Sequence, residues 1–458
     1  MLNSNGMEKQ TEADWDCPLL HRRKLHVEAF IPITYNIELL GTLEKLIAPP
    51  YDVVTPRERE MYASLHPFNI VHILLPKRLN EGSDEDAYIQ AGATVRRWLE
   101  ENILVKSPPP SVFPYKQSFK DSEGREVEQV GIIVALQLRH YATCVVRPHE
   151  KTTHSPKLDR LKLLRATRLE MSQVYALFVD DSGVADELIN GAIKGGKQWL
   201  SVTDNDGVTH LLWRVSDEGW VSELCSALEN SWVLIADGHH RYETSIEFLK
   251  ELSGEDLNDA HPACYIGAAL ANIHGRLTIL PTHRLLHFRS DKERESFEES
   301  FTKIFKLYGS VEEINLTEAL GSIREGTDGD AVNFVMVCPS KVLLLKAKPS
   351  ELSELWSNDV GNRKELLRCG VNTIALHELL LPMALKECGI SAEPCLSYTQ
   401  DAKTAIEAVR NDRCTLSILL SPLTATQLRL TAELGERLPP KSTYFYPKLP
   451  SGLIMRLV

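Results

Sequence analysis

The sequence predicts a mixed α/β (α+β) protein. Segments in which apolar residues alternate with polar ones, as in strands, are interspersed with segments in which apolar residues recur at helical spacing. The 458 residues include 43% hydrophobic and 25% charged side chains, a globular composition long enough for two or three domains. Strands and helices therefore alternate along one chain with a sizeable core.

In the first half of the chain, apolar alternation predicts strands at 25–38, 68–76, 111–119, 124–141, 174–181 and 208–216. The third and fourth of these are expected to form a hairpin around Asp121-Ser122-Glu123-Gly124. Two helices are predicted among these strands. Thr55, Pro56 and Glu58 form a helix start, with an N-cap, a proline in the first turn and a carboxylate. Val95, Trp98, Leu99 and Ile103 share one face of a helix over 87–104.

In the second half, the apolar run from Trp232 to Ala236 predicts a strand, and a helix follows over 242–252. Further strands are predicted at 263–273 and 277–288, and then in the runs "AVNFVMVCP", "KVLLLKA" and "CTLSILLSP". From about Ser290 onward these strands alternate with helices. No internal repeat or long low-complexity tract interrupts the pattern.

The formal net charge of -12 disfavours a dedicated nucleic-acid binder, because an acidic chain repels a polyanion on average. The nine cysteines show no C-x-x-C spacing, so they are expected to be reduced thiols rather than zinc ligands. We expect no secretory signal and no membrane span, and hence a cytoplasmic protein. The oligomeric state is not predicted.

The segment Asp237-Gly238-His239-His240-Arg241 lies where the strand gives way to the helix. A helix N-terminus presents backbone N–H groups and a positive dipole end, and Gly238 allows a ligand to approach the backbone. Arg241 and the two imidazoles add donors for a phosphate. The alternative is that Asp237 caps the helix and the histidines pack in the core.

A second motif, "LIAPPYDVV", places Asp52 directly after Pro49 and Pro50, which force extended backbone. A carboxylate beside a phosphate is favourable when a Mg²⁺ ion bridges the two groups. Asp52 is therefore a candidate metal ligand, and a second candidate for a catalytic role. The alternative is a surface aspartate that stabilises the turn.

A third cluster, "RPHEKTTHSPKLDR", follows an apolar strand, so a sheet would position its loop. Glu150 is a candidate general base for a hydroxyl nucleophile, and His149 could orient it. In the basic helix that follows, Arg165 and Arg168 are candidates for neutralising phosphate charge, and its other basic residues are expected to form a solvated face. The alternative is a structural ion-pair network.

Two further segments could complete a phosphate pocket. His283 and Arg284 follow the apolar run "LTILP" and could supply a basic side to it, although Arg284 could equally pair with an acidic helix. The segment "PPKSTYFYPK" near the C-terminus combines aromatic residues with two lysines that could close over a ligand, or it could be an aromatic core strand. No P-loop or Rossmann glycine motif is present.

The motif "ADGHHR" resembles the phosphate-binding corner of the ParB/sulfiredoxin-like proteins, which include a free-serine kinase. The whole chain resembles the domain-of-unknown-function family 1015, in the stretches "IAPPYDVVTPRE", "FNIVHILLP", "RPHEKTTHSPKLDRLKLLRATR", "ADGHHRYETSIEF", "LPTHRLLH" and "GERLPPKSTYFYPKL". One departure is Leu438-Pro439-Pro440-Lys441, where the family usually has Met-Pro-Gln-Lys.

These resemblances imply a ParB/sulfiredoxin-like core with large insertions over 28–290 and a C-terminal α/β region over 291–458. Residues 1–27, which begin with a polar and aperiodic stretch, are expected to form a disordered tail. They also imply that the proline loop before Asp52 faces a nucleotide, ATP or ADP, held with Mg²⁺.

The predicted function is a nucleotide-dependent phosphotransferase, a kinase acting on free serine or a similar hydroxy metabolite. The alternatives are a phosphate-ester or nucleotide hydrolase that uses water as nucleophile, and a non-catalytic nucleotide-binding partner protein. For the enzyme, we predict that Asp52, His149 or Glu150, His239, His240 and Arg241 line one cavity.

Overall fold

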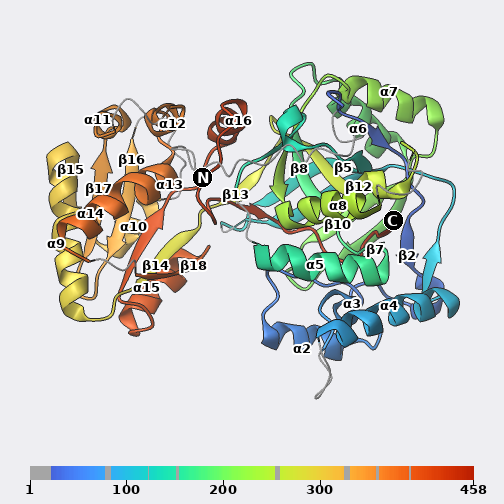
Figure 1. Cartoon of the computed structure of the whole chain (residues 1–458), viewed down its shortest axis with the longest axis horizontal. Helices are drawn as coiled ribbons and strands as arrows, with labels where there is room; N and C mark the ends of the chain where they lie inside the picture. The colour runs from blue at the N-terminus through green and yellow to red at the C-terminus, as the bar shows by residue number, and fades with distance from the viewer. Residues whose placement is uncertain are drawn as a thin grey trace. The chain divides into compact units, whose positions relative to one another are not determined.

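The computed structural model (Figure 1) describes residues 22–77, 84–121, 123–150, 154–252, 258–323, 331–356, 361–390 and 394–458. The chain forms two compact units. Unit 1 comprises Met1–Pro148, Thr152–Arg276 and Pro447–Val458, and unit 2 comprises His149–Lys151 and Leu277–Tyr446. Both units contain helices and strands, so the predicted mixed α/β class is confirmed. Most of the predicted tail falls outside the described residues, and Leu25 and Val27 at its end are buried.

Unit 1 is built on a nine-stranded mixed sheet with the order β6-β11-β8-β12-β5-β4-β10-β9, to which β1 adds by pairing with β5. β11 lies inside the sheet, parallel to β6 and antiparallel to β8. The bounds are β1 Val27–Glu28, β4 Phe113–Lys120, β5 Glu126–Gln137, β6 Val146–Pro148, β8 Val174–Phe178, β9 Gln198–Thr203, β10 Thr209–Trp213, β11 Val233–Asp237 and β12 Tyr265–Asn272. The predicted hairpin around Gly124 joins β4 to β5.

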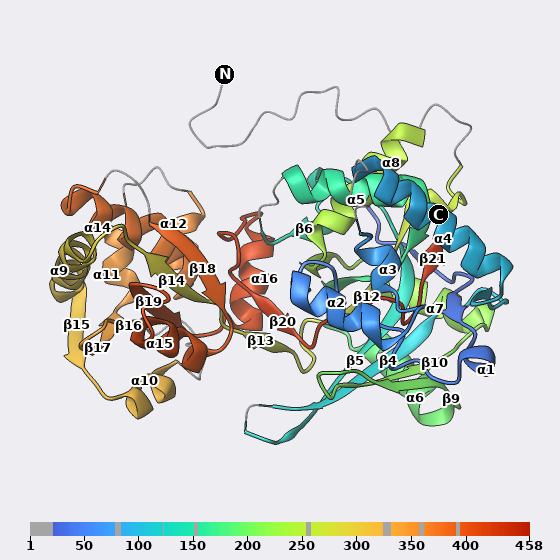
Figure 2. The same ribbon diagram turned by 90° about the horizontal axis from the view of Figure 1, so that it is seen from below.

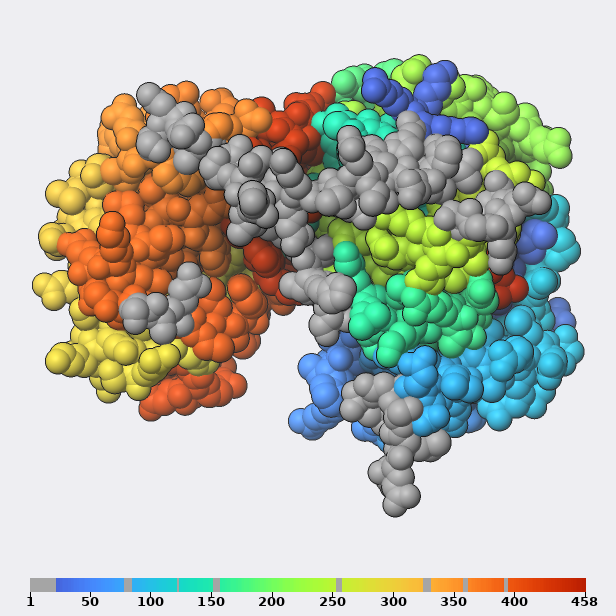
Figure 3. All heavy atoms as spheres, in the orientation of Figure 1, coloured from blue at the N-terminus to red at the C-terminus, as the bar shows by residue number. Residues whose placement is uncertain are grey.

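Helices α8 (His239–Leu252) and α5 (His154–Thr167) carry the residues that matter most for the site. α8 packs against β8 and β12. α5 packs between α8 and α4 (Asp84–Glu100), and on the face seen in Figure 3 its green surface lies between those of α8 and α4. α6 (Val184–Gly195) packs against β4 and β5, with α7 (Glu218–Leu228) beside it (Figure 2). The smaller helices are α1 Ile37–Leu40, α2 Pro56–Leu65 and α3 Val71–Leu74, with 3₁₀ turns η3 Tyr141–Thr143 and η4 Pro262–Cys264.

The start of α2 confirms the predicted capping box, because Thr55 and Glu58 exchange side-chain and backbone hydrogen bonds. The strand predicted at 68–76 is wrong: this segment is a turn followed by the short helix α3. The side chain of Asn69 causes the turn, since its Nδ2 donates to the carbonyls of Lys45 and Ile47 and its Oδ1 accepts from the N–H of Val71. The apolar run reflects the burial of Ile70, Val71, Ile73 and Leu74 rather than a strand, which periodicity alone does not distinguish.

Two predicted strands are each divided in two. The segment 25–38 forms β1 and β2 (Ile33–Tyr35), and β2 pairs with β3 (Leu104–Lys106) instead of joining the large sheet. The segment 277–288 forms β13 (Thr278–Leu280) and β14 (His283–His287), which belong to different sheets. A proline lies between the halves in both cases, Pro32 and Pro281, and proline removes a ladder donor and fixes the backbone.

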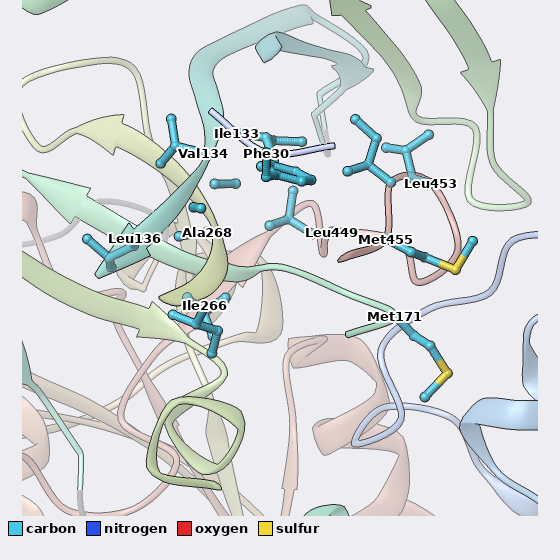
Figure 4. Packing of buried hydrophobic residues seen from close by; sticks show 14 of the residues in the cluster. Phe30, Ile133, Val134, Leu136, Met171, Ile266, Ala268, Leu449, Leu453 and Met455 are labelled. Carbon is cyan, nitrogen blue, oxygen red and sulfur yellow. The ribbon is translucent and has the colours of Figure 1, made fainter. Parts of the chain in front are cut away.

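The last twelve residues of the chain return to unit 1. β21 (Arg456–Leu457) pairs with β7 (Leu169–Glu170), and Leu449, Leu453 and Met455 are buried in the core with Phe30 and Ile133 (Figure 4). This C-terminal segment also carries Lys448, which takes part in the candidate site.

Unit 2 contains an antiparallel six-stranded sheet with the order β15-β17-β16-β19-β14-β18. The bounds are β15 Gly309–Glu313, β16 Val332–Val337, β17 Val342–Ala347, β18 Cys395–Thr399 and β19 Leu416–Leu420. A separate pair joins β13 to β20 (Tyr444–Tyr446). The helices are α9 Asp291–Tyr308, α10 Leu316–Ser322, α11 Pro349–Glu354, α12 Arg363–Arg368, α13 Asn372–Ile374, the π-helical turn η5 Ala375–Leu380, α14 Leu381–Glu387, α15 Ala402–Arg410 and α16 Ala425–Glu433.

None of the helices in the described ranges is long and apolar enough to cross a membrane. The eight cysteines in these ranges are all free thiols.

Candidate functional site

The segment Asp237–Arg241 lies at the predicted strand-to-helix junction. β11 ends at Asp237, Gly238 has a φ of +89°, and α8 begins at His239. The N–H of Tyr242 donates to the carbonyl of Gly238 at 3.0 Å, which closes the first helical turn. The segment therefore lies at the positive end of a fourteen-residue helix.

Asp237 lies between two cations. Its Oδ2 accepts a hydrogen bond from Nη2 of Arg241 at 2.8 Å, and its Oδ1 accepts one from Nζ of Lys448. Burial opposes ionisation of Asp237, but the charges of Lys448 and Arg241 outweigh it and hold the pKa of this carboxyl well below its usual range. Asp237 is therefore ionised at neutral pH and ties the C-terminal segment to the start of α8.

Arg241 is held by several partners. Its Nη1 donates to Oγ of Ser172 at 3.0 Å and to the carbonyl of Gln173 at 2.5 Å, while Nη2 bonds Asp237. Its Nε is buried and has no hydrogen-bond partner among the described residues. The guanidinium is thus fixed in one orientation, with one donor still available.

Replacing Gly238 with alanine is expected to lower the free energy of unfolding by about 1–3 kcal/mol, because a side chain strains a backbone with φ of +89°. The new Cβ would also lie 2.8–3.0 Å from three atoms of the Arg241 guanidinium, so Arg241 must shift. Gly124→Ala is the matched control, since Gly124 has φ of +79° but nothing within 4 Å of its Cβ. Urea unfolding should show a larger loss for Gly238→Ala; equal losses would contradict the close packing of Arg241.

A cavity of about 60 Å³ opens beside the first turns of α8, within unit 1. This volume suits a few water molecules or a group of similar size. Its lining residues are Tyr51, Leu74, Arg160, Leu163, Leu164, Leu169, Glu170, Met171, Ser172, Arg241, Thr244, Ser245 and Ile266. The lining comes from segments far apart in sequence. At least one residue comes from each of the motifs "IAPPYDVV", "FNIVHILLP" and "ADGHHRYETSIEF" and from helix α5.

Arg160 and Tyr51 form one side of this cavity. The Arg160 guanidinium lies 4.3 Å from the centroid of the Tyr51 ring, and its Nη1 donates to the carbonyl of Leu74 at 2.9 Å. Burial, together with the neighbouring charge of Asp52, raises the pKa of Tyr51 to about 12. The phenol is therefore a neutral hydrogen-bonding group at physiological pH.

Glu170 is the carboxylate in the cavity lining. It is paired with Arg456, whose Nε donates to Oε2 at 2.8 Å and whose Nη2 donates to Oε1 at 3.0 Å. Oε2 also accepts the N–H of Gly267 at 2.8 Å. Because Arg456 compensates Glu170, this carboxylate does not leave an unpaired negative charge in the cavity.

Other predicted residues of unit 1 do not line the cavity. Asp52 is exposed in a turn, next to Tyr51. Arg165 is exposed and bonds Glu251, with 2.8 Å between its Nε and Oε2, and Arg168 is exposed with its guanidinium 4.6 Å from the Phe248 ring centroid. His239 is buried and His240 is partly buried at the start of α8.

A single carboxylate such as Asp52 suits Mg²⁺, which often binds one or two carboxylates together with substrate phosphates. Among the residues that the structure describes, no group of three or more His, Cys, Asp or Glu side chains is arranged to hold a metal ion. A Mg²⁺ ion at Asp52 would therefore take its remaining ligands from water or from the phosphate oxygens of a bound nucleotide.

His149 and Glu150 belong to unit 2. Nε2 of His149 lies 2.7 Å from Oγ1 of Thr443, and His149 is 1% exposed. Glu150 accepts backbone N–H groups from Lys441, Ser442 and Thr443 at 3.0–3.3 Å. The Glu150 carboxylate thus holds the segment before β20, and its oxygens already accept several hydrogen bonds.

His283 and Arg284 are also in unit 2, at the start of β14. Both are buried, and Nε of Arg284 donates to Nε2 of His377 at 2.8 Å. Burial, aided by the charge of Arg284, lowers the pKa of His283 to about 4 and that of His377 to about 3. The alternative pairing of Arg284 with an acidic helix is wrong, since it bonds a neutral imidazole and a carbonyl.

Because these two histidines are buried and neutral, we expect the free energy of unfolding to decrease in mild acid. They stay neutral in the fold, whereas in the unfolded chain they take up protons near their usual pKa of 6.5, so the unfolded state gains protons as pH falls. The urea midpoint should therefore decrease between pH 6.5 and about 4. His377→Gln keeps an acceptor for Arg284 and should reduce this decrease; an unchanged pH profile would contradict the buried neutral state of His377.

Tyr51, Arg160, Ser172 and Ser245 were not predicted as site residues. Arg160 was expected on a solvated helix face, but it is buried. Its spacing to Leu163 and Leu164, at i+3 and i+4, places all three on one helix face and is the signal that could have identified it. Ser172 and Ser245 carry no comparable local signal.

Among solved structures, the chain is similar to a free serine kinase mutant in complex with AMP (11% identity, 69% of this chain and 86% of that chain covered, TM-score 0.34). It is also similar to a conserved hypothetical protein from Pyrococcus furiosus (12%, 70% and 93%, TM-score 0.33) and to a truncated SbnI from Staphylococcus aureus (9%, 66% and 81%, TM-score 0.30). No curated protein matches the chain.

The family model described as protein of unknown function (DUF1015) matches residues 27–364, which include the cavity-lining residues and the strand-to-helix junction. This match confirms the resemblance noted in the sequence motifs. The chain belongs to the DUF1015 family.

Proposed function

We propose that this protein is a nucleotide-dependent phosphotransferase, a small-molecule kinase, in which the cavity beside α8 receives a phosphate group of ATP or ADP. The observation that carries the proposal is the composition of the cavity. Two guanidiniums, Arg160 and Arg241, and three hydroxyl side chains, Ser172, Thr244 and Ser245, line it. Arginine and hydroxyl groups are the side chains that proteins use most readily for phosphate.

The preorganisation of Arg241 supports this role. Asp237, Ser172 and Gln173 fix its guanidinium, so binding a phosphate would cost little side-chain entropy. Its buried Nε still lacks a partner among the described residues and could donate to a phosphate oxygen. The dipole of α8 adds positive potential at the same end.

The size of the cavity limits what enters it. About 60 Å³ suits a phosphoryl group but not a whole nucleotide. The base and ribose would therefore lie outside the cavity. Asp52, exposed next to Tyr51, is our candidate for the Mg²⁺ ligand on the phosphate.

For activation of the acceptor hydroxyl, Asp52 is our candidate, because it belongs to unit 1 together with the cavity, whereas Glu150 belongs to unit 2. Glu150 already accepts three backbone N–H groups, which leaves fewer lone pairs for a substrate proton. We therefore expect Asp52→Asn to reduce turnover at least as much as Glu150→Gln, by about 10²-fold if the residue is the base. Full activity in both variants, measured by product formation, would exclude both as bases.

Binding is tested by thermal shift and calorimetry with ATP, ADP and adenosine in the presence of Mg²⁺. ATP and ADP should stabilise the chain, by about 2.7 kcal/mol at a hundred times the dissociation constant, and adenosine should stabilise it much less. Arg160→Met should weaken ADP binding roughly 10- to 150-fold through loss of a charged hydrogen bond. The control is Arg165→Met, on the same helix. Both arginines pair with a carboxylate, Arg160 with Asp159 and Arg165 with Glu251, but Arg160 is buried and Arg165 is exposed.

Equal affinity of the two arginine variants, or equal stabilisation by adenosine and ADP, would contradict a phosphate site in this cavity. Ser245→Ala provides a second variant if Arg160→Met is poorly folded. A nucleotide that is hydrolysed without phosphorylating any hydroxylated acceptor would favour the hydrolase alternative.

A further inference from the structure

Unit 2 contains a buried charge, Arg284, to which no anionic group is bonded among the residues that the structure describes. The side chain of Arg284 is 0% exposed, and its bonds go to neutral groups: Nε to Nε2 of His377 and Nη1 to the carbonyl of Thr282. Its Nη2 has no hydrogen-bond partner among the described residues. A buried guanidinium without a paired anion is costly, so a functional reason for it is expected.

The neighbourhood of Arg284 contains further unsatisfied polar atoms. Oγ1 of Thr282 is buried without a hydrogen-bond partner in the described structure, and the same holds for Oγ1 of Thr373. Thr282 is adjacent, because its carbonyl accepts from Arg284. Thr373 precedes His377 by four residues, one helical turn from the imidazole that Arg284 contacts. Buried polar atoms normally have hydrogen-bond partners in a protein, so Nη2 of Arg284 and the hydroxyl of the adjacent Thr282 are groups to which a small anion could bind.

Two other groups define the surroundings. The ring of Tyr398, on the neighbouring strand β18, lies 5.5 Å from the Arg284 guanidinium, and Tyr398 is 38% exposed, so it separates the guanidinium from solvent. The negative charge of Glu150 acts on Arg284 electrostatically and favours its charged form. The Glu150 carboxylate accepts hydrogen bonds from residues 441–443, and His149 lies beside it. None of these described hydrogen bonds joins Glu150 to Arg284.

We propose that Arg284 binds the carboxylate of a small organic acid in unit 2, with Nη2 and the Thr282 hydroxyl as donors and Tyr398 as a cover. One cation beside a neutral imidazole balances one negative charge, which fits a monoanionic carboxylate better than a phosphate. This site is built from different residues than the phosphate cavity of unit 1, and it does not depend on the proposed nucleotide binding.

The test uses the full chain in a carboxylate-free buffer at constant ionic strength. Its unfolding temperature is measured in acetate, glycolate and lactate, each against its neutral amide and against chloride. The three carboxylates should raise the unfolding temperature, whereas the amides and chloride should not. Equal effects of acid and amide, or no effect of any carboxylate, would overturn the proposal.

Substitutions test whether the carboxylates bind at Arg284. Arg284→Met should weaken carboxylate binding at least tenfold, while Arg289→Met, which changes an exposed arginine just after β14, should leave it unchanged. Thr282→Val keeps the branched shape and should weaken binding roughly two- to tenfold, which covers the case that Arg284→Met does not fold. An unchanged carboxylate effect in Arg284→Met or in Thr282→Val would overturn the site. Arg160→Met should retain the effect, so failure of the nucleotide proposal is recognised separately.

Discussion

Replacing Arg456 with methionine is expected to lower the free energy of unfolding by about 3–5 kcal/mol, because it leaves the buried carboxylate of Glu170 without its counter-ion. The side chains of Arg456 and Glu170 are 4% and 7% exposed, and two hydrogen bonds join them. Arg456 also donates to the carbonyl of Pro262 at 2.8 Å. Its loss would thus release the C-terminal strand β21 from unit 1. Urea unfolding of the whole chain measures the change.

The double variant Glu170→Gln, Arg456→Met removes both charges and should recover much of the loss. Lys303→Met is the control for an exposed pair, with Glu387 as its partner, and should lower the urea midpoint far less than Arg456→Met does, because water screens an exposed pair. If Arg456→Met cost no more than Lys303→Met, the pair would not be buried in solution as it is here.

Asp237→Asn is the second substitution for which a large loss is expected, again about 3–5 kcal/mol, since it removes the buried negative charge that both Arg241 and Lys448 bond. A second replacement, Lys448→Met, removes one of these cations and should recover part of the loss. A double-mutant cycle on Asp237 and Lys448 therefore measures their coupling free energy. Additive effects would contradict the contact between the C-terminal segment and α8.

The pH dependence gives an independent check on Asp237. Its pKa in the fold is lowered, so its contribution to stability is present above the usual pKa of about 3.8 and is lost as pH falls below that value. The stability difference between the wild type and Asp237→Asn should therefore be constant between pH 5 and 7 and decrease below pH 4. This window lies below most of the window in which His283 and His377 act.

Local sequence signals were sufficient for the junction at Gly238. An apolar run followed by Asp-Gly and then by helical spacing predicts a strand that gives way to a helix, and the structure has both. The capping box at Thr55 was predictable for the same reason. In both cases the interactions that fix the conformation lie within a few residues. The positive φ of Gly238 is an additional finding of the structure.

Residues that approach through the fold were not predictable in this way. Arg160 lines the cavity because α5 packs between α8 and α4, and Arg165, five residues later, faces Glu251 instead. Lys448 reaches Asp237 because the last twelve residues pack into unit 1, and no local pattern indicates that return. Tyr51, rather than its neighbour Asp52, lines the cavity, since adjacent residues in a turn point in different directions.

The strand wrongly predicted at 68–76 has a related cause. Every residue from Ile70 to Leu74, except His72, is nearly inaccessible to solvent, so its apolar run has no polar alternation to report the backbone conformation. The side chain of Asn69 and its contacts to the residues at 45 and 47 decide the matter, and these contacts are twenty or more residues away.

The most direct test of the phosphate cavity is a crystal structure of the chain with ADP and Mg²⁺. The account predicts a phosphate oxygen within about 3.2 Å of Arg160 or Arg241 and of at least one hydroxyl among Ser172, Thr244 and Ser245, with the adenosine outside the cavity. ADP bound with its phosphates away from both arginines, while the cavity contains only water, would contradict it.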